Sequence, residues 1–238
     1  MSAGEILRVD DIDVFYGASQ ILFGVSFGVE KGQSLALLGR NGAGKSTTMK
    51  AVMGLLDRTE GSVRFEGAEI RGEPPFRISR RGLGWVPEDR RVFTDLTVLE
   101  NLEVGRHPPR AGAPHWTAQR LFELFPNLGE MPGRPGGRMS GGEQQMLTVA
   151  RTLMGNPRLV LLDEPSEGVA PLIVEQMADM IEALKRQGLS VLLSEQNLPF
   201  ASAVSDRAYV LEKGQVRFAG TMDELQRDET VRRQYLTV

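Results

Sequence analysis

The sequence contains no cysteine and only two histidines. The absence of cysteine excludes disulfide bonds, thiolate nucleophiles and thiolate metal sites. His107 and His115 lie in a stretch rich in proline and glycine, with no second ligand at metal-binding spacing. We therefore expect both histidines at the surface.

Long apolar runs and an excess of one charge are absent as well. No segment reaches the roughly 18 uninterrupted apolar residues that a membrane-spanning helix needs, and Met1–Asp10 has no apolar core of a signal peptide. Lysine and arginine (28) nearly balance aspartate and glutamate (31), and the net charge of −3 gives no basic surface for nucleic acid. We expect a cytoplasmic protein that meets a membrane only through a partner.

Short apolar runs and helical stretches follow one another along the chain and predict an α/β protein. Predicted strands are Ile6–Val9, Ser34–Leu38, Ser62–Phe65, Ala68–Ile70, Leu83–Val86, Leu159–Asp163, Ser190–Ser194, Tyr209–Glu212 and Gln215–Phe218. Predicted helices are Lys45–Leu56, Val98–Val104, Thr117–Phe125, Gly142–Met154 and Leu172–Gln187. We interpret residues 1–238 as one domain, with a mostly helical subdomain of about residues 88–155 inserted between core strands.

A phosphate-binding loop is the clearest motif. It fits G-x-x-x-x-G-K-[ST] at every fixed position and is made of Gly39, Arg40, Asn41, Gly42, Ala43, Gly44, Lys45 and Ser46, followed by Thr47. The glycines let backbone N–H groups curl around phosphate oxygens, and the predicted helix after the loop adds its positive end. We expect Lys45 to neutralise the β- and γ-phosphates of a nucleoside triphosphate and the Ser46 hydroxyl to ligate Mg²⁺.

Two adjacent carboxylates end the apolar strand Leu159–Asp163. A strand end beside a phosphate site is where a Mg²⁺-organising aspartate belongs, and we assign Asp163 that role. Glu164, one residue further, would activate the water that attacks the γ-phosphate. Together with Lys45, the pair predicts hydrolysis of the bound nucleotide.

A third motif, Ser140, Gly141, Gly142 and Glu143, opens the predicted helix 142–154. Ser140 is a good N-cap, and the glycines leave N–H groups open to an anion. With the two other motifs, the chain resembles the ATPase subunits of ABC transporters over essentially its whole length. The resemblance implies ATP and Mg²⁺ as ligands, and a fold with a P-loop parallel-sheet core, an N-terminal antiparallel β subdomain and an inserted helical subdomain.

In that family the signature segment (Met139–Glu143) contacts the γ-phosphate held by the opposite subunit, which implies a head-to-tail dimer enclosing two ATPs. Tyr16 matches the aromatic residue that stacks on adenine, and Arg151 the usual cation on the helix behind the signature segment. The alternative for Tyr16 is an ordinary tyrosine of an edge strand.

Three further segments resemble the smaller of the two ATPases of branched-chain amino acid importers. They are Val86–Phe93, Asp163–Pro171 and Ser194–Asn197, and the end of the chain near Tyr235 also matches, without a C-terminal extension. This implies a second ATPase subunit (a heterodimer, with a homodimer as the alternative), two permease subunits contacted near Glu88–Phe93, and indirectly a periplasmic or extracellular solute-binding protein. The chain would lie at the cytoplasmic face of the membrane.

Three positions depart from the wider family. Glu88 stands where glutamine is usual and would ligate Mg²⁺ as a carboxylate. Gln196 replaces a histidine at the γ-phosphate, and because an amide carries no charge, we expect slower hydrolysis at this site than at the partner's. Ala170 replaces an aspartate that helps to connect the two sites.

Other functions remain open at this stage. The transported solute could instead be urea, a short amide or another small polar molecule. A non-transport ABC ATPase of DNA repair or translation would carry a long coiled-coil insertion or two ATPase modules, which this chain lacks. A P-loop kinase would not explain Ser140–Gln145. We expect no nucleic-acid partner.

Overall fold

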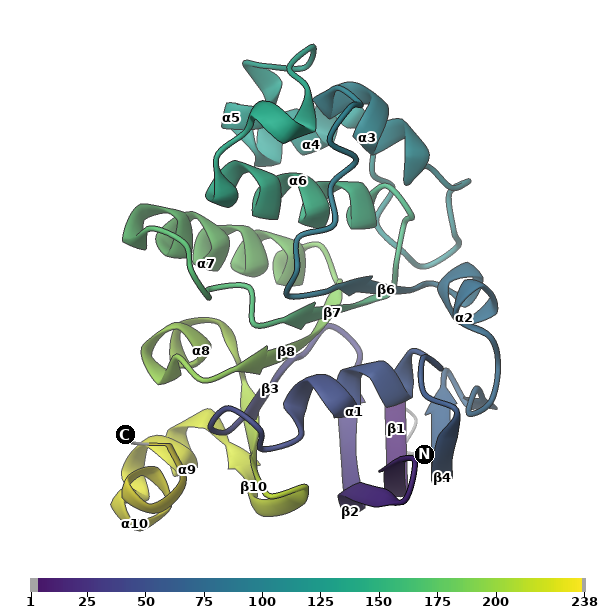
Figure 1. The fold of residues 1–238 in the computed structure, drawn as a ribbon. Helices are drawn as coiled ribbons and strands as arrows, with labels where there is room; N and C mark the ends of the chain where they lie inside the picture. The colour runs from purple at the N-terminus through teal and green to yellow at the C-terminus, as the bar shows by residue number, and fades with distance from the viewer. Residues whose placement is uncertain (1–3, 237–238) are drawn as a thin grey trace.

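The computed structural model describes residues 4–236. Figure 1 shows a central sheet with helices above it and, below it, the helix that follows the phosphate loop beside a second sheet. No helix in the described range is long and apolar enough to cross a membrane.

The first sheet is antiparallel, with strand order β2-β1-β4-β5. Its strands are β1 (Glu5–Tyr16), β2 (Ser19–Glu30), β4 (Arg58–Phe65) and β5 (Ala68–Glu69). The predicted strand Ile6–Val9 is only the start of β1, and β2 was not predicted. The acidic residues of β1 and the glycines of β2 hide the strand pattern, since both residue types are depleted in strands.

The second sheet has the order β10-β9-β3-β8-β7-β6. Its strands are β3 (Ser34–Leu38), β6 (Leu83–Val86), β7 (Leu159–Asp163), β8 (Ser190–Glu195), β9 (Arg207–Glu212) and β10 (Gln215–Thr221). All neighbours are parallel except β9 and β10. The carboxyl ends of β3, β7 and β8 therefore meet at one edge, where the phosphate loop and both predicted carboxylates begin.

Both faces of this sheet are buried, and alternate residues of a strand enter different cores. In β7, Val160 and Leu162 pack in the core beneath the helices. Leu159 and Leu161 pack in the other core, with the antiparallel sheet. This double burial explains the uninterrupted apolar sequence of β7.

The helices are α1 (Lys45–Val52), α2 (Pro75–Arg81), α3 (Val98–Val104), α4 (Ala118–Leu124), α5 (Pro126–Gly129), α6 (Gly141–Leu153), α7 (Pro171–Arg186), α8 (Leu198–Val204), α9 (Met222–Arg227) and α10 (Glu229–Val231). Short turns of 3₁₀ and π helix span Gly136–Arg138 and Arg232–Leu236. Helices α3 to α6 lie between β6 and β7 in the chain and gather at the end of the molecule away from α1 (Figure 1).

Two expectations about helices need correction. Helix α1 ends at Val52 rather than Leu56, because Gly54 turns the backbone into the left-handed region with φ 66°. Helices α2 and α8 were not predicted. Helix α2 buries only Ile78, so its sequence carries almost no helical period, and α8 is a short helix with Pro199 in its first turn.

Candidate functional site

The phosphate loop runs from the end of β3 into α1. A cavity of about 490 Å³ lies against it and is lined by Tyr16, Ile21, Asn41, Gly42, Gly44, Lys45, Ser46, Thr47, Glu88, Glu164 and Glu167. Gly39 has a φ of 155° and Gly44 one of 110°, a backbone region that residues with a side chain rarely adopt. The structure thus gathers most of the predicted nucleotide-binding residues around one hollow, while Gly39, Arg40 and Ala43 shape the loop behind it.

Lys45 is buried, with 3% of its surface exposed. Its Nζ donates to the carbonyl oxygens of Gly39 at 2.8 Å and Arg40 at 3.2 Å. The same ammonium lies 3.0 Å from Oε1 of Glu164, whose side chain is 6% exposed. A triphosphate that binds Lys45 therefore competes with a carboxylate for a desolvated cation.

Asp163 lies deep at the end of β7. Its Oδ1 accepts hydrogen bonds from the hydroxyls of Ser46 at 3.0 Å and Ser194 at 2.8 Å. Burial raises the pKa of the Asp163 carboxyl, since the charged form loses its water. A cation beside it would offset this loss, and a carboxylate next to a serine hydroxyl is a hard-oxygen donor set that suits Mg²⁺.

Glu164 has a φ of 45°, which places it in the left-handed region. Successive residues of a strand point to opposite faces. The left-handed turn allows Glu164 and Asp163 to reach the phosphate loop together, the first through Lys45 and the second through Ser46. Gln196 donates from Nε2 to Oε2 of Glu164 at 3.0 Å. The structure therefore brings both predicted catalytic residues into direct contact.

Glu88 and Tyr16 lie at the mouth of this cavity and are exposed, Tyr16 by 47%. Tyr16 ends β1 and pairs with Ser19 across the hairpin. Its ring is therefore open on one side, as a base-stacking residue needs to be. In the described part of the chain, no group of three or more His, Cys, Asp or Glu could hold a metal by itself.

The signature segment lies elsewhere. Ser140 caps α6 in a full capping box: its backbone N–H donates to Oε2 of Glu143 at 2.6 Å, and its hydroxyl accepts from the Glu143 N–H. Within the described residues, the lining of the phosphate-loop cavity does not include Ser140–Glu143. The two predicted halves of the nucleotide site are not brought together within one chain.

Sequence reasoning missed three residues around the site. Glu195 is 1% exposed and accepts N–H bonds from Ser166, Gln196 and Asn197 at 3.0 to 3.1 Å. It thereby joins the segment after Glu164 to the segment that carries Gln196. Burial raises the pKa of Glu195. The position of Glu195 at the end of an apolar strand was the feature of the sequence that could have identified it as a site residue.

Glu167 and Arg90 are the other two residues that were missed. A hydrogen bond with Glu164 raises the pKa of Glu167, whose side chain is exposed at the same cavity. Arg90 donates to the carbonyl oxygen of Gly168 at 3.1 Å, across 78 residues of sequence. Arg90 lies in the matching segment Val86–Phe93, but the sequence assigned it no role, because its contacts exist only in the fold.

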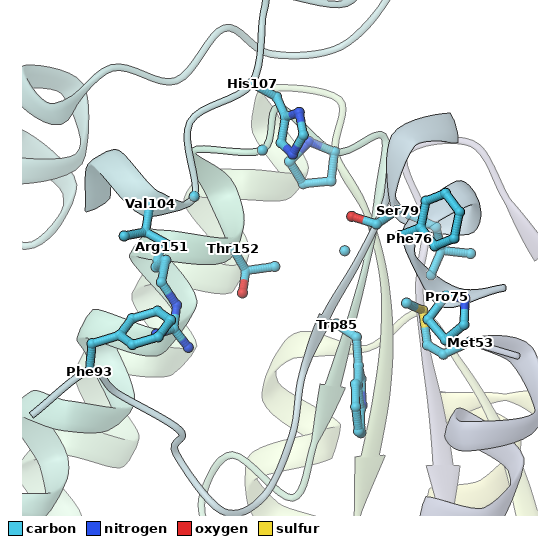
Figure 2. A pocket seen from close by; sticks show the side chains of 15 residues that line it. Met53, Pro75, Phe76, Ser79, Trp85, Phe93, Val104, His107, Arg151 and Thr152 are labelled. Atoms are coloured by element: carbon cyan, nitrogen blue, oxygen red, sulfur yellow. The ribbon is translucent and has the colours of Figure 1, made fainter. Parts of the chain in front are cut away.

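A second cavity of about 450 Å³ lies between α2, β6, α3 and α6 (Figure 2). Phe76, Phe93 and Val104, which line it, are between 47% and 56% exposed. Arg151 of α6 lies over the Phe93 ring at 5.0 Å and donates to the carbonyl oxygen of Arg91 at 2.7 Å. Burial lowers the pKa of Arg151. His107 also lines this cavity and is half-buried, so only His115 is exposed as expected.

Comparison with known proteins identifies the family. The family model described as "ABC transporter" matches residues 22–167. The high-affinity branched-chain amino acid transport ATP-binding protein BraG of Pseudomonas aeruginosa is 44% identical over 97% of this chain and 99% of its own length. The lipopolysaccharide export system ATP-binding protein LptB of Escherichia coli is 35% identical over 93% of this chain and 92% of its own.

A solved structure agrees with these sequence relatives. The crystal structure of a nucleotide-free ATP-binding cassette from an ABC transporter has a TM-score of 0.81 and 29% identity, over 93% of this chain and 94% of its own. Its likeness covers both sheets and confirms the predicted fold class. The chain therefore belongs to the ABC transporter family, as an ATP-binding subunit that hydrolyses ATP.

Proposed function

We propose that this chain hydrolyses ATP with Glu164 as general base and thereby energises the import of branched-chain amino acids. The observation that carries the catalytic part is the position of Glu164. It lies at the phosphate loop, paired with Lys45 at 3.0 Å and hydrogen-bonded by Gln196 at 3.0 Å. A base must lie within hydrogen-bond reach of the water it deprotonates, and this buried carboxylate contacts the lysine that is expected to bind the γ-phosphate.

The phosphate loop binds the triphosphate through its N–H groups and Lys45. Phosphate oxygens take over the Lys45 ammonium, and Glu164 is released from its ion pair to face the attacking water. The Glu164 carboxylate accepts the proton of that water as its oxygen bonds to the γ-phosphorus, while the bond to the β-phosphate oxygen breaks. The products are ADP and inorganic phosphate.

Two hydrogen bonds orient this base, one through a side chain and one through the backbone. Gln196 holds one carboxylate oxygen of Glu164, and the backbone N–H of Glu164 donates to the carbonyl oxygen of Ser194 at 3.0 Å. Asp163 and Ser46 would hold Mg²⁺, with Glu88 at the cavity mouth as a further ligand, and the ion would supply positive charge to the phosphate oxygens. Tyr16 would stack on the adenine.

The signature segment acts on another subunit's nucleotide in this proposal. Ser140–Glu143 lies outside the lining of the chain's own cavity but presents an exposed helix end with N–H groups open to an anion. A second ATPase subunit, docked head to tail, would bring its γ-phosphate there.

The permease subunits would dock in the second cavity, next to Glu88–Phe93. An ABC ATP-binding subunit belongs to a complex with permeases, and the groove offers three exposed apolar side chains together. Trp85 Nε1 and Arg151 Nη1 have no hydrogen-bond partner among the described residues. A permease helix with apolar residues and a carbonyl or carboxylate acceptor would fit such a groove.

The choice of solute rests on similarity. BraG, a branched-chain amino acid transport ATP-binding protein, is 44% identical to this chain, whereas LptB, a lipopolysaccharide export ATP-binding protein, is 35% identical to it. The chain itself does not contact the solute, so urea or short amides remain the alternative cargo.

The catalytic proposal is tested by replacing Glu164 with Gln in the chain assembled with its transporter. We expect ATP to bind at least as tightly, because Lys45 no longer pairs with a carboxylate, and free phosphate release to fall by a factor of about 10² to 10⁴. Glu182→Gln on α7, the same chemical change at a half-buried carboxylate that pairs with Lys185, serves as the control and should hydrolyse normally. Undiminished hydrolysis by the Glu164 variant would refute the assignment, and a phosphorylated small molecule as product would indicate a kinase.

The transport proposal is tested in proteoliposomes containing the whole transporter and its solute-binding protein. We expect ATP-dependent uptake of labelled leucine, isoleucine or valine, with competition among the three and none by urea or acetamide. ATP-dependent extraction of a lipid, or uptake blocked by urea, would assign a different cargo.

A further inference from the structure

Arg90 connects three segments that are distant in sequence. It follows Glu88 in the loop after β6, and its guanidinium Nη2 donates to the carbonyl oxygen of Gly168 at 3.1 Å, with a longer contact of 3.5 Å to that of Glu167. Both acceptors lie just after Glu164. The side chain thus reaches from the proposed permease contact to the segment that carries the proposed base.

The same guanidinium also packs on the signature segment. A Cβ placed on Gly141 would collide with Nη1 of Arg90, whereas the Gly141 backbone itself is not in the left-handed region. The absence of a side chain at Gly141 therefore leaves the space that Arg90 occupies. The guanidinium lies between the start of α6 and the segment 164–170.

The backbone of Arg90 is held as well. Its carbonyl oxygen accepts a hydrogen bond from the buried hydroxyl of Thr148, one turn along α6 beyond Gln144. Its φ of 54° lies in the left-handed region, which L residues rarely adopt. Such strain persists only where surrounding contacts enforce it. Here the enforced turn aims the side chain at Gly168.

We propose that Arg90 is a positioning residue that clamps the segment after Glu164 to the signature segment. Ala170 has no polar side chain to hold this segment, and Glu195 ties it only to the Gln196 side through Ser166. Arg90 supplies the tie on the other side. A displacement of the Glu88–Phe93 loop or of α6 is then passed to Glu164 through one rigid, five-donor group.

This inference rests on the proposed role of Glu164, and the test separates the two. The main variant is Arg90→Asn, because asparagine tolerates the left-handed turn but has no guanidinium. The matched control is Arg233→Asn in the short π helix Arg232–Leu236, the same charge change at an exposed arginine outside the proposed sites, where the guanidinium pairs with Glu229 at 3.1 Å. Arg90→Lys keeps the positive charge but loses the planar guanidinium with its several N–H donors.

Hydrogen exchange of the full chain without nucleotide tests the clamp itself. We expect Arg90→Asn to exchange about tenfold faster than wild type in both segments 140–143 and 164–170, from loss of the packing on Gly141 and of the bonds to Glu167 and Gly168. Arg233→Asn should match wild type, and the urea midpoints of the two variants should agree. Unchanged exchange, or faster exchange in one segment alone, would overturn the clamp.

Kinetics of the assembled transporter test its consequence. Arg90→Asn should lower kcat about tenfold with KM for ATP within about twofold, since the phosphate loop is untouched and only the base is misplaced. Arg90→Lys should recover part of kcat. A kcat equal to that of Arg233→Asn would overturn the positioning role, whereas normal hydrolysis by Glu164→Gln would refute the assignment of the base instead.

Discussion

At the scale of single residues, Gln196 is the side chain that orients the proposed base. It holds Glu164 through a neutral amide, at 3.0 Å. A histidine could bring a positive charge to the γ-phosphate at the same place. The amide is the reason to expect hydrolysis at this site to be slow.

We predict that Gln196→His raises the rate of hydrolysis at this site about tenfold, which corresponds to 1–2 kcal/mol of added charge assistance. Single-turnover phosphate release from the assembled transporter would measure it. Gln196→Asn, which keeps the amide but shortens its reach, should lower the rate. A histidine variant slower than wild type would show that the amide is already the better partner.

Glu195 leads to a prediction about how the free energy of unfolding depends on pH. Burial raises its pKa above the ordinary value of 4.5, so ionisation disfavours the folded state. The penalty is absent below the unfolded pKa and grows as pH rises through the folded pKa. A Glu195→Gln variant has no charge to desolvate. Its stability relative to wild type should therefore increase between pH 4.5 and 7.5, by about 1.4 kcal/mol per unit of pKa shift.

Urea unfolding of both proteins at the two pH values measures this difference. The comparison cancels other titrating groups, because they are common to both proteins. If the variant instead became less stable than wild type as pH rises, the three N–H bonds to Glu195 would outweigh the cost of desolvating its charge.

At the scale of elements, the N-cap residue of α6 stabilises the helix and also belongs to the signature segment that is proposed to bind ATP. Ser140 and Thr221 each close a full capping box, at the start of α6 and α9. Only the first belongs to the signature segment. Substitutions of these two cap residues can therefore be compared to separate an effect on stability from an effect on catalysis.

We predict that Ser140→Ala and Thr221→Ala each lower the free energy of unfolding by about 1 kcal/mol. Only Ser140→Ala should also lower ATP hydrolysis by the assembled transporter, by about tenfold or more, through the lost anion contact. Urea unfolding and phosphate release would be measured in parallel. Equal activities of the two variants would argue that Ser140 is a cap and nothing further.

At the scale of the whole molecule, we propose that the chain presents half of each of two sites. Lys45, Ser46 and Glu164 line one cavity, whereas Ser140–Glu143 lies outside its lining in the described structure. Complete sites would form only when two subunits meet, so the contribution of each subunit can be measured separately.

The expected asymmetry follows from this arrangement. We predict that replacing Glu164 by Gln here reduces transport-coupled hydrolysis less than the equivalent change in the partner ATPase, because the Gln196 site is the slower one. Steady-state phosphate release from the two singly altered transporters would show it. Equal losses would contradict the asymmetry.

Local motifs were readable from the sequence. The phosphate loop, the carboxylates at the end of β7 and the Ser140 cap each depend on fixed residue types at fixed spacing, which is a property of the chain alone. Strands buried on both faces, such as β3 and β7, were readable for the same reason. Helix α2 and strand β2 were not, since their residues follow no clear period and become regular only against their neighbours.

Contacts between distant residues were decided by the tertiary structure. The Lys45–Glu164 pair spans 119 residues, the difference between their numbers, and the Arg90–Gly168 bond spans 78. The left-handed turn at Glu164 also has no sequence marker, because a glutamate adopts it only under enforcement by its surroundings. The sequence by itself determined which groups are predicted to meet the phosphates. Only the fold decided how those groups hold one another, because packing brings them within hydrogen-bond distance.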